Sequence, residues 1–368
     1  MILHLFHYDH KTGHQFATYV INQFSGPEMM SEFVFMTENS IAELATNRSV
    51  RFISPNDRKT FHDLLTSLKN YSAVVFHGLF EPWSETVLRA IPESVKVAWM
   101  FWGGEIYAYS ESFLAPKTSL LFRLHNIIRR RKQSLSWRLP VELYRRIDYC
   151  MTDVEEEYEY AKRFIRSEKL SHIWYSYYSI EDTIGDYSHD PIGNNVLIGN
   201  SAAIENNHVD IVASFFLPWN RKCVHDKRVI IPLSYGSRWV RNVVVRMASI
   251  VFSSRFYPLV DFLPRNEYNR YIQSCSTVIL LYYRPAAQGN IITALWLGKR
   301  VYLSEHSMIY SFFKRIGAHV FSFESEFRHL GCKGLTESEI LHNRSVLQDW
   351  YGREHVKKAC CNVVKCLN

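Results

Sequence analysis

Short runs of apolar residues alternate with amphipathic segments along most of this chain. In the first half, apolar runs typical of buried strands occupy residues 2–6, 32–36, 50–52, 73–76, 97–101 and 149–152. Segments with helical spacing of apolar positions lie between them, as at residues 15–24, 59–68 and 84–90. A second series of strand-like runs follows at residues 196–199, 228–232, 251–256, 277–283, 301–304 and 319–321. This alternation predicts an α/β protein in which crossover helices connect parallel strands.

A polar segment separates the two series. Residues 181–195 are rich in Asp, Gly, Ser, Pro and Asn, which is the composition of a linker. We therefore expect an N-terminal Rossmann-like domain at residues 1–180 and a C-terminal one at residues 196–345, facing each other across a cleft. The last part of the chain, residues 346–368, has a helical pattern. We expect this C-terminal helix to pack back on the N-terminal domain.

The composition narrows the class of protein. Of the 368 residues, 47% are hydrophobic and 21% are charged, which is typical of a folded globular protein. Aromatic residues make up 15% of the chain, enough to line a ligand cleft or a membrane-facing surface as well as a core. The net charge of +7 favours anionic partners: nucleic acid, phospholipid or a phosphorylated substrate.

Other features of the sequence concern targeting and cofactors. The first residues lack a basic region followed by a long apolar run, so we expect no signal peptide. No uninterrupted apolar run reaches the length of about 18 residues that a transmembrane helix needs. The seven cysteines lack the paired spacings of a zinc site, and we interpret them as reduced cytosolic thiols. We expect neither a bound metal nor another cofactor.

The most informative stretch is a strand, a polar loop and a helix at residues 277–297. The loop carries one cation, two amides and a glycine, namely Arg284, Gln288, Asn290 and Gly289. In an α/β protein, the free N–H groups and the positive dipole end of a helix that follows such a loop face a bound anion. The pattern therefore predicts a site for a nucleotide diphosphate.

Further polar loops follow other strands of the same half. Gly199, Asn200 and Ser201 come after one strand, and Tyr235 and Gly236 come after the next. The carboxyl ends of parallel strands meet at one edge of a sheet, where open α/β sheets bind ligands. We therefore expect these loops to converge with residues 284–290. Glu305, after a later strand, is placed to accept hydrogen bonds from ribose or sugar hydroxyls; the alternative is a solvated turn residue.

Two strands of the first half end in polar residues and glycines. His77 follows one strand, and Trp102, Gly103 and Glu105 follow the next. We expect His77 and Glu105 to contact an acceptor hydroxyl or to act as a general base, although a histidine in this position is often structural. His14, in a loop after the first strand, is predicted to bind the acceptor in the same way, with the same structural alternative.

Residues 120–146 mix large apolar side chains with many cations and a single acid. The cations and the tryptophan that we assign to an anionic membrane surface are Arg123, Arg129, Arg130, Arg131, Lys132 and Trp137. Basic amphipathic segments with aromatic residues favour such surfaces. A solvated helix face is the alternative. No nucleic-acid-binding motif accompanies the segment, so we expect no nucleic-acid partner.

Several of these blocks resemble one known family. They are residues 75–82 (VFHGLFEP), 99–107 (WMFWGGEIY), 196–201 (VLIGNS) and 229–232 (VIIP) with Tyr235, together with Arg284, Gln288 and Gly289. In this order along the chain they resemble the bacterial TDP-N-acetylfucosamine:lipid II N-acetylfucosaminyltransferases, glycosyltransferase family fifty-six. The chain departs from the family pattern at Asn290, where the second small-residue step after Gln-Gly is missing.

The resemblance implies a GT-B fold with the nucleotide-sugar donor on the C-terminal domain and the acceptor on the N-terminal domain. It implies transfer of a deoxyamino sugar, such as 4-acetamido-4,6-dideoxygalactose, from a dTDP-sugar to a polyprenyl-diphosphate-linked glycan. Arg284 is then a catalytic residue at the leaving diphosphate, beside His77 or Glu105 at the acceptor. The family works in the synthesis of enterobacterial common antigen, and close relatives in that of O-antigen, which places this chain peripherally on the cytoplasmic face of the inner membrane.

Two alternatives remain open from the sequence. One is an O-antigen or capsule transferase that uses a UDP- or GDP-sugar. The other belongs to a different class: a two-lobed protein that binds a sugar or nucleotide without catalysis.

Overall fold

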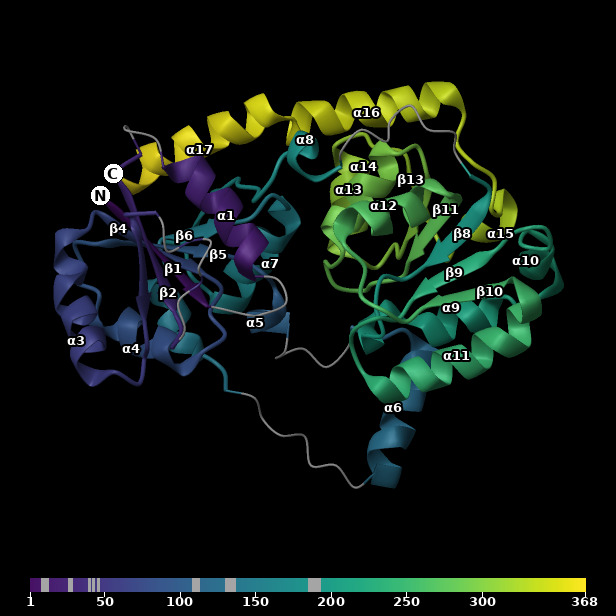
Figure 1. The fold of residues 1–368 in the computed structure, drawn as a ribbon, viewed down its shortest axis with the longest axis horizontal. Helices are drawn as coiled ribbons and strands as arrows, with labels where there is room; N and C mark the ends of the chain where they lie inside the picture. Colours follow the sequence, from purple (N-terminus) through teal and green to yellow (C-terminus); the bar gives the residue numbers. More distant parts are fainter. Residues whose placement is uncertain are drawn as a thin grey trace. The chain divides into compact units, whose positions relative to one another are not determined.

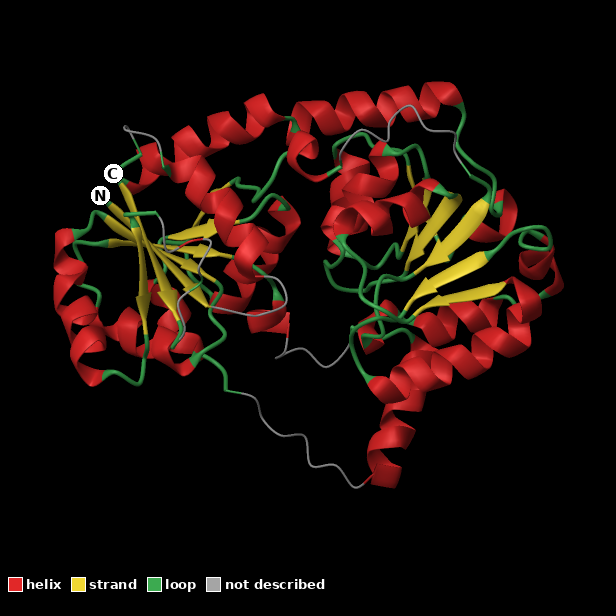
Figure 2. Ribbon diagram, viewed as in Figure 1, coloured by secondary structure: helices red, strands yellow, loops and turns green. Residues whose placement is uncertain are grey.

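Two parallel β-sheets organise the part of the chain that the computed structural model describes, which is residues 1–7, 13–25, 29–38, 41, 44, 47–107, 113–129, 137–184 and 193–368. Each sheet belongs to one of two compact units. Unit 1 comprises Met1–Tyr109, Ser134–Ser179 and Arg353–Asn368, and unit 2 comprises Ser110–Gln133 and Ile180–Gly352. Figure 1 labels their elements, and Figure 2 shows helices on both faces of each sheet. The α/β class predicted from the sequence is confirmed.

Unit 1 has seven strands in the order β3-β2-β1-β4-β5-β6-β7. The strands are β1 (Ile2–His7), β2 (Ser31–Met36), β3 (Val50–Ile53), β4 (Ala73–His77), β5 (Lys96–Met100), β6 (Tyr149–Met151) and β7 (Ser171–Ile173). The helices are α1 (Gly13–Phe24), α3 (Arg58–Ser67), α4 (Pro82–Ala90), α5 (Gly104–Tyr107), α7 (Glu155–Ile165) and α17 (Arg353–Leu367), with 3-10 turns η1 (Leu68–Asn70) and η2 (Val141–Arg146).

Alternate residues of the central strands of unit 1 are buried on opposite faces of the sheet. Ile2 and Phe6 of β1 belong to the core under α1 and α17. On the other face, Phe76 of β4 stacks with Trp83 of α4, with ring centroids 6.3 Å apart. Burial on both faces is why these strands are continuous apolar runs, as parallel sheets require.

Unit 2 has six strands in the order β10-β9-β8-β11-β12-β13. The strands are β8 (Asn195–Ile198), β9 (Val229–Pro232), β10 (Phe256–Leu259), β11 (Cys275–Leu280), β12 (Arg300–Leu303) and β13 (Val320–Ser322). The helices are α6 (Pro116–Arg129), α8 (Ile180–Thr183), α9 (His208–Ser214), α10 (Pro218–Lys222), α11 (Arg238–Phe252), α12 (Arg265–Gln273), α13 (Gln288–Trp296), α14 (Met308–Arg315), α15 (Phe327–Leu330) and α16 (Glu337–Tyr351), with 3-10 turns η3 (Ile204–Asn206) and η4 (Ser253–Arg255).

Both sheets have the strand order of the doubly wound Rossmann fold. The direction of winding reverses between β1 and β4 in unit 1 and between β8 and β11 in unit 2. Ligands of such sheets bind beyond the carboxyl ends of the strands at this switch point. In unit 2 the switch point lies between the loops that follow residues 198 and 280.

Helix α6 belongs to unit 2, although the sequence places residues 110–133 in the N-terminal domain. The cause is two buried side chains around the start of α9. The Asn207 Oδ1 accepts the N–H of Ala115 at 2.8 Å, and the Asp210 carboxylate accepts those of Lys117 and Thr118 at 2.9 and 2.7 Å. The Asp210 charge therefore stabilises the N-terminal end of α6.

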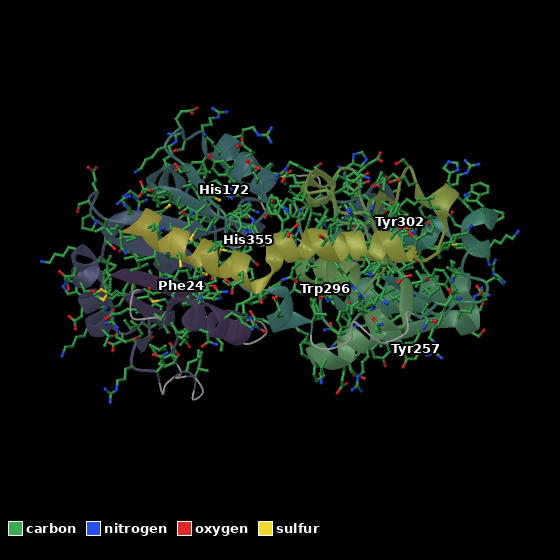
Figure 3. The ribbon with its side chains drawn as sticks, turned by 90° about the horizontal axis from the view of Figure 1, so that it is seen from above. Phe24, His172, Tyr257, Trp296, Tyr302 and His355 are labelled. Atoms are coloured by element: carbon green, nitrogen blue, oxygen red, sulfur yellow. The ribbon has the colours of Figure 1, made fainter. Side chains whose placement is uncertain are left out.

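The C-terminal helical pattern forms two helices, because the chain is extended at Gly352 (φ −65°, ψ 151°). Helix α16 belongs to unit 2, where Arg344 donates to the carbonyl of Trp296 at 2.9 Å. Helix α17 belongs to unit 1, where Val356, Cys360, Val363 and Leu367 enter the core under α1. Figure 3 labels His355 on α17, and its ring lies 4.6 Å from that of Trp174.

One predicted strand is wrong, and one strand was not predicted. Residues 251–256 were expected to form a strand, but Val251 and Phe252 end α11 and β10 begins only at Phe256. Val251 continues a buried helical stripe with Val240, Val244 and Ala248, and local apolar content alone cannot separate that stripe from a strand. Strand β7 escaped prediction because its short sequence, Ser-His-Ile, has too few apolar positions.

Candidate functional site

The loop after β8 forms one side of the switch point in unit 2. Gly199 has φ +69°, and its N–H donates to the carbonyl of Ile279 on β11 at 2.8 Å. A Cβ atom at this position would lie 2.2 Å from Nε2 of His208 and 2.9 Å from Oδ1 of Asn206. Both the backbone conformation and the close approach therefore require glycine here.

The Asn206 side chain holds this loop through two hydrogen bonds. Its buried amide accepts the N–H of Asn200 at 2.9 Å and donates to Oγ of Ser201 at 3.0 Å. The neighbouring Asn207 donates to the carbonyl of Leu281 at 2.6 Å, which connects the β8 loop to the loop after β11. Asn200 and Ser201, predicted as donor-binding residues, are thus held in place by Asn206, and Asn207 joins the neighbouring loop; the sequence pattern singles out neither asparagine.

The loop after β9 is joined to the loop after β8 by backbone hydrogen bonds. The Ala202 N–H donates to the carbonyl of Tyr235 at 2.7 Å, and the Ser237 N–H donates to that of Ala202 at 3.0 Å. Gly236 has φ +112°, and a Cβ there would lie 2.4 Å from the carbonyl carbon of Ala202. Gly236 is therefore needed for close approach of the two loops, whereas the Tyr235 side chain is 44% exposed at their rim.

The loop after β11 brings a phenol and a cation to the same place. The buried Tyr282 hydroxyl donates to Oδ1 of Asn200. Burial raises the pKa of Tyr282 well above its usual range, and the nearby charge of Arg284 acts in the opposite direction. Arg284 pairs with Glu205 across 3.9 Å, at the outer limit of an ion pair, and its side chain is partly exposed. Tyr282, Arg284 and the Gly199–Ser201 loop are thus brought together.

Helix α13 begins at this loop without a side-chain cap. Ala287, its N-cap residue, has the left-handed conformation (φ 58°, ψ 23°) and a side chain that cannot accept a hydrogen bond. The first N–H groups of a helix have no acceptor within the helix, and the dipole makes this end positive. Gly289 and Asn290 lie in the first turn, partly exposed, and the N–H of Asn290 donates to the carbonyl of Ala287 at 2.9 Å. Gln288 also lies there, but its amide donates to Tyr351 of α16 at 2.9 Å.

Glu305 follows β12, the strand next to β11. Its Oε2 accepts hydrogen bonds from Ser322 at 2.6 Å and Ser325 at 2.7 Å. These two bonds lower the pKa of Glu305, so the carboxyl is ionised at neutral pH. It lies at the same edge of the sheet as the other loops of unit 2, with one oxygen committed to the two serines.

In unit 1, both ring nitrogens of His77 are engaged. Nε2 lies 3.1 Å from Nδ1 of His4, and Nδ1 lies 3.2 Å from the hydroxyl of Tyr177. Burial, and next the neighbouring His4, lower the pKa of His77 well below its usual value. The ring is therefore neutral, and Tyr177 separates it from Trp102, whose indole N–H donates to the Tyr177 hydroxyl at 3.0 Å.

Glu105 lies on α5, immediately after the glycine pair at 103 and 104. Its Oε1 accepts the N–H of Leu79 at 3.3 Å and the indole N–H of Trp99 at 3.2 Å. Its Oε2 is buried and has no hydrogen-bond partner among the described residues. Burial raises the pKa of Glu105 to about 7, so this carboxyl exchanges a proton near neutral pH. Such a pKa suits a general base.

Two aromatic rings next to these groups are partly exposed. Trp102 and Phe80 are each 37% exposed. A Cβ at Gly78 (φ +94°) would lie 2.7 Å from the Phe80 ring and 3.7 Å from that of Trp102. A Cβ at Gly103 would lie 2.2 Å from the ring of Tyr107. The glycines therefore allow these rings to pack closely against the backbone at the carboxyl edge of the sheet.

A second buried acid lies close to Glu105. Glu157 of α7 accepts hydrogen bonds from Tyr107 and Thr152, each at 3.0 Å. Burial, followed by repulsion from Asp153, raises the pKa of Glu157 to about 8. Both of its oxygens have hydrogen-bond partners, whereas the buried Oε2 of Glu105 has none among the described residues.

Several residues that were predicted to contact the acceptor or a membrane lie outside the described part of the chain, or their side chains do. Arg130, Arg131 and Lys132 lie outside the described residues, and the side chains of His14 and Arg129 do so too. Arg123 is exposed on α6 of unit 2, whereas the partly buried Trp137 belongs to unit 1. Residues 120–146 are therefore divided between the two units. Arg146, in η2 of unit 1, donates to the carbonyls of Pro92 and Val95 at 2.7 and 2.8 Å.

Within the described ranges, no helix is both long enough and apolar enough to cross a membrane. In the same residues, no group of three or more His, Cys, Asp or Glu side chains is arranged to hold a metal ion.

No protein-family model and no curated protein sequence matches the chain. Several solved structures match the fold of the chain. A glycosyltransferase from Rickettsia africae is 11% identical, with a TM-score of 0.64 over 100% of this chain and 98% of that one. The E. coli trehalose-6-phosphate structure with UDP-2-fluoro glucose bound is 8% identical, with a TM-score of 0.64 over 100% and 98%. Anabaena HepE in complex with UDP and glucose is 10% identical, with a TM-score of 0.56 over 100% and 94%. The chain therefore has the GT-B fold of glycosyltransferases, as predicted from its sequence.

Proposed function

We propose that the protein is a glycosyltransferase that takes a sugar from a nucleotide-diphosphate donor. The observation that carries the proposal is the convergence, at the switch point of unit 2, of the Gly199–Ser201 loop, Tyr282, Arg284 and the uncapped start of α13. A cation and a helix N-terminus are suited to a diphosphate. The UDP in the Anabaena neighbour and the UDP-sugar in the E. coli one support a donor of this kind.

In the proposed reaction, the bond between the sugar C1 and the diphosphate oxygen breaks, and an acceptor hydroxyl oxygen bonds to C1. Arg284 and the α13 N–H groups stabilise the charge that develops on the leaving diphosphate. Asn200, Ser201 and Tyr235 line the donor site. Gly199 and Gly236 allow the two loops to approach each other, and Glu305 accepts hydrogen bonds from the ribose through its second carboxylate oxygen.

We propose that unit 1 binds the acceptor. The Oε2 of Glu105, which has no hydrogen-bond partner among the described residues, takes the proton of the attacking hydroxyl, and the raised pKa of Glu105 supports this role. Trp102 offers an aromatic face to an acceptor sugar, and its indole N–H is fixed by Tyr177. His77 positions Tyr177 rather than meeting substrate itself, because both of its ring nitrogens are engaged.

The donor class is the first test. The family resemblance favours a dTDP-linked 4-acetamido-4,6-dideoxygalactose. We expect thermal-shift assays with a panel of nucleotide sugars to raise Tm most with the dTDP-sugar, less with dTDP alone, and least with UDP- and GDP-sugars. A larger shift with a UDP- or GDP-sugar would replace the dTDP assignment by the O-antigen or capsule alternative. Binding of a donor without its transfer or hydrolysis would instead support the non-catalytic alternative.

We propose that the acceptor is a polyprenyl-diphosphate-linked glycan and that the protein meets it at the cytoplasmic face of the inner membrane. Helix α6 supports a membrane contact, because its inner face packs on unit 2 through His125, whose ring stacks 4.1 Å from Trp239. Its outer residues Leu120, Leu124, Ile127 and Ile128 are 47–79% exposed. Arg123 and Lys117 are exposed on the same helix, and four cations follow at 129–132.

Replacing both Ile127 and Ile128 with Ser is therefore expected to weaken binding to anionic phospholipid vesicles at least about tenfold, because each inserted side chain contributes roughly 1 kcal/mol or more. Changing Arg129, Arg130 and Arg131 to Ser is expected to weaken the binding and to reduce its salt dependence. Vesicle co-sedimentation measures both effects. Ile250→Ser, on α11 and 69% exposed, serves as the control. An equal loss of vesicle binding in Ile250→Ser would contradict a membrane contact through α6. Binding of the wild-type protein to neutral vesicles alone would contradict it as well.

A further inference from the structure

Two cysteines far apart in the sequence meet in unit 2. Cys223 follows α10, and Cys332 follows α15 after Gly331. Their Sγ atoms lie 3.0 Å apart across a sequence separation of 109 residues. Gly331 (φ +59°) brings the backbone close: a Cβ there would lie 3.3 Å from that of Cys223. Nothing in the spacing of the cysteines indicates this contact, so the sequence alone predicts separate thiols.

The two thiols differ in exposure and acidity. Cys332 is buried, whereas Cys223 is partly exposed and can meet a small molecule from solvent. The hydrogen bond from Cys332 lowers the pKa of Cys223. Burial acts in the opposite direction, and the charge of Lys227 adds a smaller lowering effect. The same hydrogen bond, together with burial, raises the pKa of Cys332. The exposed partner is therefore the better nucleophile of the pair.

Neither metal binding nor simple packing accounts for the cysteine pair. A metal site needs further ligands, and the described residues hold no group of three or more metal-binding side chains. A purely packing role would not require the two sulfur atoms to approach within 3.0 Å. The geometry instead matches two thiols that can be joined with little movement of the backbone.

We propose that Cys223 and Cys332 form a reversible disulfide bond, with a low-molecular-weight disulfide as oxidant. The Cys223 thiolate attacks one sulfur of the oxidant, forms a mixed disulfide and expels one small thiolate. The Cys332 thiol then loses its proton, attacks the Cys223 sulfur and expels the second small thiolate. The protein thiols lose two electrons and two protons, and the oxidant gains them as two small thiols.

The bond would connect the end of α10 to the segment after α15. This segment is anchored at the amino-terminal side of the sheet, where the carbonyl of Cys332 accepts a hydrogen bond from Ser276, near the start of β11, at 3.4 Å. The polar loops of the candidate site follow the other ends of the strands. We therefore expect the disulfide to stabilise unit 2 with little effect on ligand binding, independently of the proposed function.

The test treats the full-length protein with excess oxidised glutathione and maps its peptides by mass spectrometry. The expected result is a peptide pair joined through Cys223 and Cys332. We also expect Tm to rise by about 5 to 10 °C and to return when dithiothreitol is added, because a closed loop of about 100 residues restricts the unfolded chain. Cys223→Ser should abolish both changes, and Cys361→Ser, which removes an exposed thiol in unit 1, should abolish neither.

Three results would overturn the proposal. The first is glutathione held at Cys223 with Cys332 still reduced, and the second is no reaction of Cys223 while Cys361 reacts. The third is a Tm shift that persists in Cys223→Ser. Peptide mapping of the wild-type protein after treatment with oxidised glutathione decides the first two. The proposal therefore remains testable even if a variant fails to fold.

Discussion

Glu105→Gln is expected to reduce sugar transfer about 10²- to 10⁴-fold, the contribution typical of a general base, while making the protein more stable at pH 8. The substitution keeps the shape of the side chain, and the amide oxygen can accept the same hydrogen bonds from Leu79 and Trp99. It removes the ability of Oε2 to take a proton. Steady-state transfer rates and chemical denaturation measure the two effects.

The gain in stability follows from the raised pKa. A buried carboxyl whose pKa rises from 4.5 to about 7 binds its proton more tightly in the folded protein than in the unfolded chain. Its contribution to the free energy of unfolding therefore falls as the pH rises from about 4.5 to about 7 and stays low above that. The total fall is about 3 kcal/mol. Glu105→Gln should remove it, so the variant gains stability at pH 8 and little at pH 5.

Glu157→Gln is the matched control, because Glu157 is also buried with a pKa raised to about 8 but has partners on both oxygens. We expect Glu157→Gln to be more stable than the wild-type protein at high pH, as for Glu105→Gln. Its rate of sugar transfer should stay within a few-fold of the wild-type rate. Wild-type turnover in Glu105→Gln would remove Glu105 from the mechanism. A variant that is less stable at pH 8 than the unmodified protein would contradict the raised pKa of Glu105.

Arg284→Ala is expected to weaken donor binding about 10- to 100-fold and to lower kcat a further 10²- to 10³-fold. A charge-assisted hydrogen bond to a ground-state diphosphate contributes about 1.5–3 kcal/mol, and stabilisation of developing charge in the transition state contributes more. The Glu205 pair should cost little stability when broken, because it is long and partly exposed. Calorimetric titration with dTDP and single-turnover kinetics separate the two effects.

Arg284→Lys should recover part of the binding and less of the rate, because a lysine supplies the charge without the paired donors of a guanidinium. Arg221→Ala, on α10 and exposed, removes an equal charge from unit 2 away from the loops. A similar loss in Arg221→Ala would mean that the overall charge of the unit, and not Arg284, controls donor binding.

Much of the fold could be predicted because parallel strands buried on both faces leave unbroken apolar runs. Strands β1, β4 and β11 were predicted on this basis. The prediction failed where burial did not distinguish helix from strand, as at Val251, and where a short strand was polar, as at Ser171–Ile173. The grouping of α6 with unit 2 depends on hydrogen bonds that the Asn207 and Asp210 side chains accept from backbone N–H groups at the start of α6. These bonds join residues about 90 positions apart and leave no local pattern.

The candidate site was predicted in part for the same reason. Loops after parallel strands must meet at one edge, so the convergence around Gly199, Tyr235 and Arg284 follows from strand order. The residues that shape those loops were not predicted. Asn206 acts through a buried amide, and Tyr282 continues an apolar run, so neither differs from a core residue in the sequence. His4 escaped notice in the same way, inside the first strand.

The proposed mechanism depends above all on binding of the donor diphosphate at the switch point of unit 2. A crystal of the protein soaked with dTDP tests this binding site. We expect electron density for the diphosphate within hydrogen-bonding distance of the Arg284 guanidinium and of the N–H groups in the first turn of α13. A nucleotide bound elsewhere on the chain, or one whose diphosphate points away from Arg284, would show that the switch point is not the donor site.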